Sequence, residues 1–315
     1  MATTVSRFKV VTVALVVTGL VWLGCGRDQR NLTAPAIQQP SLSARTSQHK
    51  GLGAVLAAQG HQTALDDHAN DLFYTTAGGG AELFAIQVRG SAITTTDIGP
   101  TNGGNCLSLA LSPSGTLYSM CGPLFGPGPQ HLATIDPKTG RANLFGMAVP
   151  GLAVMAMAFA PNGILYAVGD CNPNANFECT PGSDPNYNSL YTVKEATGEF
   201  TRVGSTGAPQ FFMDLGFDGN GNLVGVTSSA NPSPLPAILY RIDPATGAAT
   251  KIINLVGSNS VMGLAFGGNG GLFATDFAQN PGLYLVDITT GFETAIAALP
   301  FGYSSGLKLA NPRED

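Results

Sequence analysis

The residue of this sequence best placed to do chemistry is Asp214, because it is a carboxylate set among apolar neighbours. It lies in the segment Phe212 to Phe217, FMDLGF, whose alternation of bulky and small residues predicts a buried β-strand. A carboxylate buried there is costly unless it is paired. Two interpretations follow: Asp214 is a ligand-binding group, or it is a structural group that accepts backbone N–H bonds from a neighbouring sheet.

A second set of carboxylates lies in the longest loop-like stretch, Asp170 to Asn188, which is rich in Asn and acidic side chains. Its acidic side chains form a candidate site for a cation or a partner: Asp170, Glu178 and Asp184. The alternative is that these residues only form turns on a solvated loop.

Familiar catalytic and metal-binding motifs are absent from the sequence. The segment Asp218 to Asn222 is similar to the start of a calcium loop, but Leu223 and Ser229 stand where an EF-hand needs a glycine and a carboxylate. The histidines have no metal-binding spacing, and no serine lies in a G-x-S-x-G motif. We therefore predict no catalytic residues, no resident metal and no cofactor, with calcium as the one ion that stays open.

The elements that must position these residues belong to a repeat. Its clearest copy, Val261 to Gly291, combines an apolar strand, a glycine turn, two further strands and a closing turn. Other copies of its first half begin at Cys106, Val154 and Phe212, at intervals of roughly 50 residues. Four short strands in a unit of this length are typical of a β-propeller blade.

The two ends of the chain predict how the propeller closes. Asp71 to Gly99 offers three strands of a blade without an innermost one, and Ser304 to Leu309 supplies a spare strand. We align that strand with Val261 to Phe266, which places Gly306 in the column of Asp214. The prediction is an all-β, five-bladed β-propeller over residues 66–310, with four antiparallel strands per blade, the first blade closed by the C-terminal strand, and a tail at 311–315. A sixth blade drawn from residues 51–66 stays open.

The same alignment predicts which face carries function. Connections between the second and third strands of a blade are long and variable, whereas the other turns are short, and variable loops on a rigid scaffold usually carry specificity. We define the long-loop face by these connections: 75–82, 121–130, 169–188, 227–237 and 275–281. Candidate ligand-binding residues that accompany Asp214 come from its column and from the blade entries: Ser108, Asn105, Gln210, Asn259 and Tyr303.

The N-terminus predicts export. A basic start precedes an apolar run, Val10 to Gly24, which has the length of a secretory signal and ends at Cys25. This end resembles the lipobox of bacterial lipoproteins, which implies a signal peptide over 1–24 and a lipid on Cys25, although Trp22 departs from the aliphatic residue of that pattern. Ordinary secretion and a retained anchor helix are the alternatives. Residues 25–65 are predicted to form a flexible tether.

Four further cysteines predict disulfides. Cys106 and Cys121 lie equally far from the centre of a hairpin, which places them opposite each other on paired strands. Cys171 and Cys179 are the second expected pair, within one insertion. Paired cysteines indicate a compartment outside the cytoplasm. Four buried free thiols are the alternative.

Composition excludes one class of partner. Charged residues make up only 11% of the chain, the formal net charge is −5, and no cluster of Lys or Arg occurs. Nucleic-acid binding therefore has no electrostatic basis.

The segments AFAPNGILYAV (158–168) and LYRIDPATGAATKI (239–252) resemble the repeats of secreted bacterial β-propellers of the YVTN, NHL and WD40-like kinds. Together with the lipobox, the resemblance implies an outer-membrane or cell-surface lipoprotein that touches the membrane only through its lipid, or else a periplasmic or secreted protein. Two functions stay open. The first is a non-catalytic binding or scaffold propeller that recognises a protein or glycan. The second is a metal-dependent hydrolase, lactonase or lyase, which needs three or four oxygen ligands converging on the central channel.

Overall fold

The computed structural model describes residues 70–123, 129–149, 152–171, 187–228, 235–257, 260–278 and 281–310, and only the backbone of residues 147–149 and 171. The chain divides into two units, residues 1–38 and 39–315, and every described residue belongs to the second. The predictions for the signal, the tether and the tail, and those for Cys25, Cys179, Glu178, Asp184 and Asn259, lie outside the described residues. Within the described residues, no helix is long and apolar enough to span a membrane.

The described chain forms five separate four-stranded antiparallel sheets, as predicted. The first, from the inside outwards, is β20 (Ser305–Leu309), β1 (Asp71–Ala77), β2 (Glu82–Arg89) and β3 (Ala92–Pro100). The second is β4 (Cys106–Leu111), β5 (Leu117–Cys121), β6 (Gln130–Ile135) and β7 (Ala142–Val149). The third is β8 (Leu152–Phe159), β9 (Leu165–Cys171), β10 (Ser189–Lys194) and β11 (Glu199–Ser205). The fourth is β12 (Phe211–Phe217), β13 (Leu223–Ser228), β14 (Ile238–Ile242) and β15 (Ala249–Asn254). The fifth is β16 (Val261–Phe266), β17 (Leu272–Asp276), β18 (Gly282–Val286) and β19 (Glu293–Ala298).

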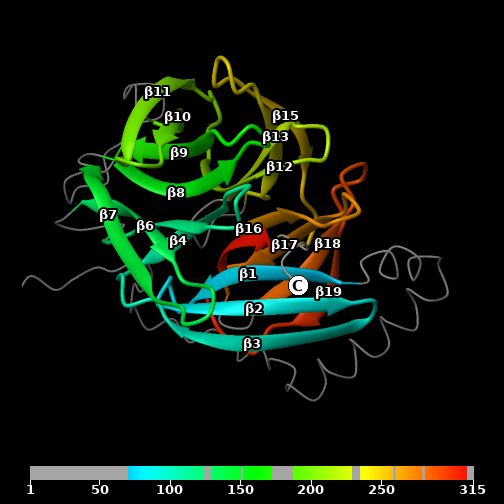
Figure 1. The fold of residues 1–315 in the computed structure, drawn as a ribbon. Coiled ribbons are helices and arrows are strands. Elements are labelled where there is room, and N and C mark those ends of the chain that lie inside the picture. The colour runs from blue at the N-terminus through cyan, green and yellow to red at the C-terminus, as the bar shows by residue number, and fades with distance from the viewer. Residues whose placement is uncertain are drawn as a thin grey trace, which may run out of the picture. The chain divides into compact units, whose positions relative to one another are not determined.

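The five sheets are the blades of a closed propeller. The innermost strands contact one another in the cyclic order β20, β4, β8, β12, β16 and back to β20, and the blades surround them (Figure 1). β20 pairs antiparallel with β1, so the C-terminal strand completes the first blade, and that prediction is confirmed. Closure in this way leaves no first or last blade with a bare flank.

Hydrophobic side chains fill the spaces between neighbouring blades. One cluster, for example, joins Ala156 and Leu190 of the third blade to Phe212 and Leu215 of the fourth. Each large apolar side chain buried in this way contributes roughly 1.5–3 kcal/mol. A blade therefore depends on both of its neighbours for stability.

The predicted alignment of the C-terminal strand is wrong by one residue. Each innermost strand contains a β-bulge, and in β20 the extra residue is Gly306, which has a left-handed φ of 65°. Leu307, not Gly306, pairs with Thr75 as Gly263 pairs with Thr275, so Leu307 shares the column of Asp214. Consequently Lys308 takes a position that the other four blades give to large apolar residues: Leu109, Met157, Leu215 and Leu264.

Backbone bonds tie a blade passage to a second-to-third connection in the first, third, fourth and fifth blades. Thr206 N donates to Asn188 O, and Leu299 N donates to Pro281 O. The blade entries and the variable connections therefore lie on the same side of the ring.

Aspartates close the turns between the third and fourth strands on the opposite face. Main-chain N–H groups two residues on lower the pKa of Asp136 and Asp243 most, while for Asp287 the Thr290 hydroxyl is the largest cause of a lowered pKa. The hydroxyl three residues on donates to each carboxylate, at 2.7 to 2.8 Å. The charged form of each aspartate is thus favoured by folding.

These lowered pKa values predict acid sensitivity. Stability gained from such carboxylates is present above their unfolded pKa of about 3.9 and is lost as the pH falls through the folded values. Replacing all three (Asp136→Asn, Asp243→Asn, Asp287→Asn) should make the free energy of unfolding fall less steeply below about pH 4, as measured by urea unfolding at a series of pH values. Asp97→Asn, which alters an exposed carboxylate on β3, is the control and should change that slope less. An unchanged slope in the triple variant would contradict the assignment.

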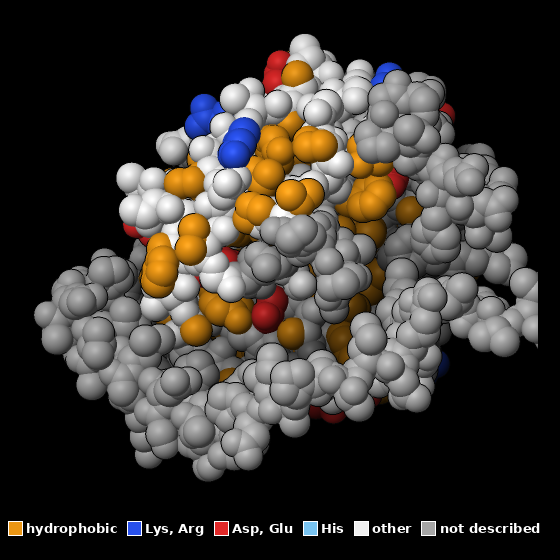
Figure 2. All heavy atoms as spheres, turned by 180° about the vertical axis from the view of Figure 1, so that it is seen from behind, with side chains coloured by type: hydrophobic (Ala, Val, Ile, Leu, Met, Phe, Trp, Pro, Cys, Tyr) orange, Lys and Arg blue, Asp and Glu red, His pale blue; other side chains and the backbone are white. Residues whose placement is uncertain are grey.

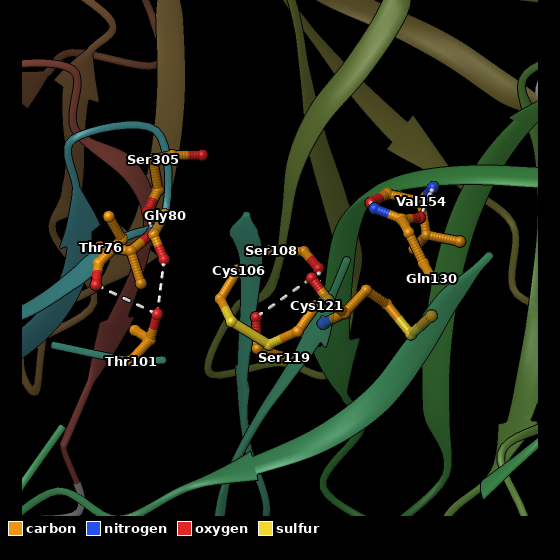
Figure 3. The surroundings of a disulfide bond; sticks show 12 residues. Thr76, Gly80, Thr101, Cys106, Ser108, Ser119, Cys121, Gln130, Val154 and Ser305 are labelled. Carbon is orange, nitrogen blue, oxygen red and sulfur yellow. Dashed lines mark hydrogen bonds between the residues drawn. A yellow bond between two sulfur atoms is a disulfide. The ribbon is translucent and has the colours of Figure 1, made fainter. Parts of the chain in front are cut away.

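The predicted disulfide between Cys106 and Cys121 is present, and it joins β4 to β5 at a fully buried position (Figure 3). Cys106 and Cys121 face each other directly in the strand register. For Cys171 and Cys179, the second predicted pair, the side chains lie outside the described residues.

Loss of this disulfide should destabilise the propeller. For a loop of 15 residues, the chain-entropy model gives a loss of about 3 kcal/mol, so the double variant Cys106→Ala, Cys121→Ala should unfold at lower urea concentration without reductant. Adding dithiothreitol should lower the midpoint of the wild-type chain and leave that of the double variant in place. Equal midpoints for the two chains in the absence of reductant would refute this account.

Candidate functional site

The carboxylate of Asp214 lies where the innermost strands of three blades meet. Its Oδ1 accepts a bond from Leu215 N at 2.8 Å, within its own strand β12. Its Oδ2 accepts bonds from Leu264 N of β16 at 2.7 Å and from Leu307 N of β20 at 3.0 Å. The side chain is fully buried. Asp214 therefore accepts backbone N–H bonds from two other blades, as the structural interpretation of this residue requires.

The partner of this carboxylate is Lys308, whose Nζ lies 2.6 Å from Asp214 Oδ1. The same ammonium donates to two main-chain carbonyl oxygens, those of Leu215 at 2.7 Å and Leu264 at 3.2 Å. An ammonium has three donors, and all three are used. Lys308 was not among the predicted site residues because the alignment placed it one column away, although a lysine in an otherwise apolar strand was the available signal.

Burial and pairing act on this ion pair in opposite directions. Burial raises the pKa of the Asp214 carboxyl, while the nearby Lys308 ammonium and the N–H donors oppose the shift. Burial likewise lowers the pKa of the Lys308 ammonium, and Asp214 opposes it. Burial is the larger effect on both groups, and their pairing offsets part of its cost.

The chemistry open to this site is limited by its bonding. Both oxygens of the carboxylate already accept two bonds each. In the part of the chain that the structure describes, no group of three or more His, Cys, Asp or Glu side chains is arranged to hold a metal. The ion pair of Asp214 and Lys308, which we call the axial ion pair, is thus satisfied where the innermost strands β12, β16 and β20 meet.

The other predicted site residues are spread over the blades. Ser108 Oγ accepts a bond from Met120 N at 3.2 Å within the second blade. Gln210 lies in the fourth blade, where Thr227 Oγ1 donates to its Oε1 at 3.1 Å. Asn105 is exposed at the entry to β4. Among the described residues, no hydrogen bond joins Asp214 to any of these three side chains.

Asp170 and Tyr303 occupy two further places on the long-loop face. Asp170 lies near the end of β9, and the pKa of Tyr187 rises to about 12 through burial first and the charge of Asp170 second. Tyr303 lies at the entry to β20, with 45% of its surface exposed.

Uncharged side chains that the sequence did not single out bind the backbone across blade boundaries. Gln130 of β6 accepts a bond from Val154 N at 2.8 Å and donates to Val154 O (Figure 3). Asn188 does the same ahead of β10, accepting from Phe212 N and donating to Ala208 O. A buried hydroxyl chain from Thr275 through Ser304 to Thr75 joins the fifth and first blades. These contacts are structural in character.

Comparison with known proteins adds little beyond the fold. No family model and no curated protein matches the sequence. A protein of unknown function from Bacteroides thetaiotaomicron is 14% identical, with a TM-score of 0.47, over 76% of this chain and 66% of its own. A gluconolactonase from Xanthomonas campestris is 12% identical, with a TM-score of 0.44, over 76% of this chain and 79% of its own. A PQQ-bound aldose sugar dehydrogenase from Streptomyces coelicolor is 13% identical, with a TM-score of 0.45, over 76% of this chain and 82% of its own. Likenesses this distant carry no argument about function.

The axial ion pair can be tested with a double-mutant cycle. Lys308→Met removes the ammonium and leaves the carboxylate buried alone, which should lower the free energy of unfolding by about 3–5 kcal/mol. The double variant Asp214→Asn, Lys308→Met should lose less than the sum of the two single losses, because the pair is removed together. Urea unfolding measures all four chains.

The matched control is Lys251→Met, which alters an exposed lysine on β15. It should change the free energy of unfolding by less than about 0.5 kcal/mol. Additive losses in the cycle, or a Lys308→Met chain as stable as the wild type, would show that the two ions are not coupled.

Proposed function

We propose that this chain is a non-catalytic binding or scaffold propeller that recognises a protein or glycan through its long-loop face. The observation that supports this proposal is the axial ion pair of Asp214 and Lys308. It lies where the innermost strands β12, β16 and β20 meet, and both oxygens of its carboxylate are already bonded, which favours recognition through the long-loop face over metal binding at this place.

The competing function, a metal-dependent hydrolase, lactonase or lyase, needs several oxygen ligands around one cation at the axis. The described oxygens that converge there are Asp214 Oδ1, Leu215 O and Leu264 O, and each is bonded to the Lys308 ammonium. The Lys308 ammonium is therefore itself the cation that these oxygens bind. A metal would have to displace this ammonium from a buried position.

The long-loop face supports the proposal through its variability. Its connection between β1 and β2 is confined to residues 78–81, whereas the one between β9 and β10 runs over residues 172–188. The opposite face repeats one aspartate turn in the second, fourth and fifth blades. Variation confined to one face of a uniform scaffold is typical of a recognition surface.

For location we propose export, with the lipid on Cys25 as anchor. The disulfide between Cys106 and Cys121 is compatible with this location, since such bonds persist in oxidising compartments.

Metal analysis distinguishes the two functions. We expect the purified full chain to contain no stoichiometric calcium or zinc, and we expect EDTA to leave its thermal unfolding midpoint unchanged. A tightly held, stoichiometric divalent metal at the axis would overturn the proposal in favour of the enzyme.

A variant extends this test to the role of Lys308. Lys308→Ala frees three oxygens that surrounded the ammonium, so millimolar calcium should raise the thermal midpoint of this variant and not that of the wild type. In Asp214→Asn, Lys308→Ala the carboxylate is also gone, and the calcium response should be lost. A wild-type chain that responds to calcium as strongly as Lys308→Ala would show that the lysine does not fill the cation position.

A further inference from the structure

Tyr303 is an aromatic residue held in a backbone conformation that suits glycine. Its φ is 58°, in the left-handed region, where bulky residues are rare. Such a conformation is strained and persists where the surrounding structure imposes it, often at functional sites.

The segment that carries Tyr303 is fixed on both sides. Tyr303 N donates to Ala278 O at 2.7 Å, and Gly302 O accepts a bond from Gly78 N at 2.9 Å. Both partners belong to connections of the long-loop face, one in the fifth blade and one in the first. The next residue, Ser304, is buried in the hydroxyl chain described above. The tyrosine is therefore presented rigidly, close to the start of the innermost strand β20.

The ring of Tyr303 packs against one aromatic neighbour and is otherwise partly exposed. The Phe277 ring packs against it with centroids 5.0 Å apart and planes inclined by 49°. Even so, 45% of the tyrosine is exposed, whereas Tyr166, Tyr187 and Tyr191 are buried. An exposed aromatic face on a rigid support is a stacking platform.

From these observations we infer that Tyr303, backed by Phe277, is a stacking platform for a sugar ring, and that the ligand of the long-loop face is an uncharged glycan. The inference rests on the proposed function and names the ligand class within it. The C–H face of a pyranose is apolar and covers one aromatic ring, and its hydroxyls hydrogen-bond with neighbouring polar groups.

Charge and size favour a glycan over a protein partner. The described residues that fix or contact the tyrosine segment are uncharged: Gly78, Phe277, Ala278, Gly302 and Ser304. Charged side chains are also few and scattered on the described surface in Figure 2. A stable protein interface buries about 800 Å² on each partner and usually centres on several anchors, whereas one exposed ring matches one sugar ring.

The experiment uses the full chain and a panel of neutral oligosaccharides: cellohexaose, xylohexaose, maltohexaose and chitohexaose. Binding is measured by isothermal titration calorimetry and by the ultraviolet difference spectrum of tyrosine, which reports stacking directly. We expect at least one of these sugars to bind. Tyr303→Gly should weaken that binding at least tenfold while the chain stays folded, because glycine adopts this φ without strain.

Two controls separate the platform from a general effect. Tyr303→Phe keeps the ring and should retain affinity within about threefold, a difference well below the 1.4 kcal/mol of a tenfold change. Phe292→Ala removes an exposed ring elsewhere, 57% exposed at the turn between β18 and β19, and should leave the affinity unchanged.

The result that overturns the inference is a chain that binds no sugar of the panel, or a Tyr303→Gly variant that binds as the wild type does. If sugar binding fails while a purified protein partner binds in a manner lost in Tyr303→Gly, the glycan assignment is wrong and the proposed binding function stands. A stoichiometric axial metal would instead remove the proposed function itself, so the two failures are distinguishable.

Discussion

The closed ring depends on one buried ion pair. Asp214 and Lys308 are both withdrawn from water, and burying either ion without the other costs several kcal/mol. They are 94 residues apart in sequence, on β12 and β20, so the pair exists only when the C-terminal strand has docked. Leu307 N, which also donates to Asp214, arrives with the same strand. The first blade therefore closes in the same step that brings Lys308 to Asp214. In a ring without this strand, the charge of the Asp214 carboxylate would be uncompensated.

The neutral contacts between blades solve a related problem. Each innermost strand is paired along one edge only, so its other backbone groups need partners. Gln130 and Asn188 supply them by bonding to the innermost strand of the following blade. At the seam between the first and second blades, Ser305 Oγ donates to Leu107 O at 2.7 Å. Polar side chains at these positions are satisfied by backbone, which explains why amides and hydroxyls can be fully buried without forming a ligand site.

The sequence was sufficient for the architecture because the architecture is periodic. Repeated strands and glycine turns predicted five blades, closure by the C-terminal strand, the long-loop face and the disulfide between Cys106 and Cys121. The axial pair was missed because the sequence alignment matched Gly306 with Gly263, which placed Lys308 one column away from Leu264, its counterpart in the structure. The left-handed backbone of Tyr303 has no sequence signal either, because glycine would be expected there. Single-residue irregularities, invisible to a periodic pattern, set the details of the site.

The distribution of strain and satisfaction limits where this propeller can recognise a ligand. In the axial ion pair, Asp214 has no open acceptor and Lys308 has no spare donor. In the turns of the opposite face, the carboxylates accept bonds from their own backbone. The hydrogen bonds at the axial ion pair and on the opposite face are satisfied without Tyr303. They therefore do not explain a strained aromatic residue on the long-loop face. Among the described contacts of Tyr303, a glycine at this position would lose only the packing on Phe277. The persistence of the strained backbone is therefore best explained by what the exposed ring meets outside the chain.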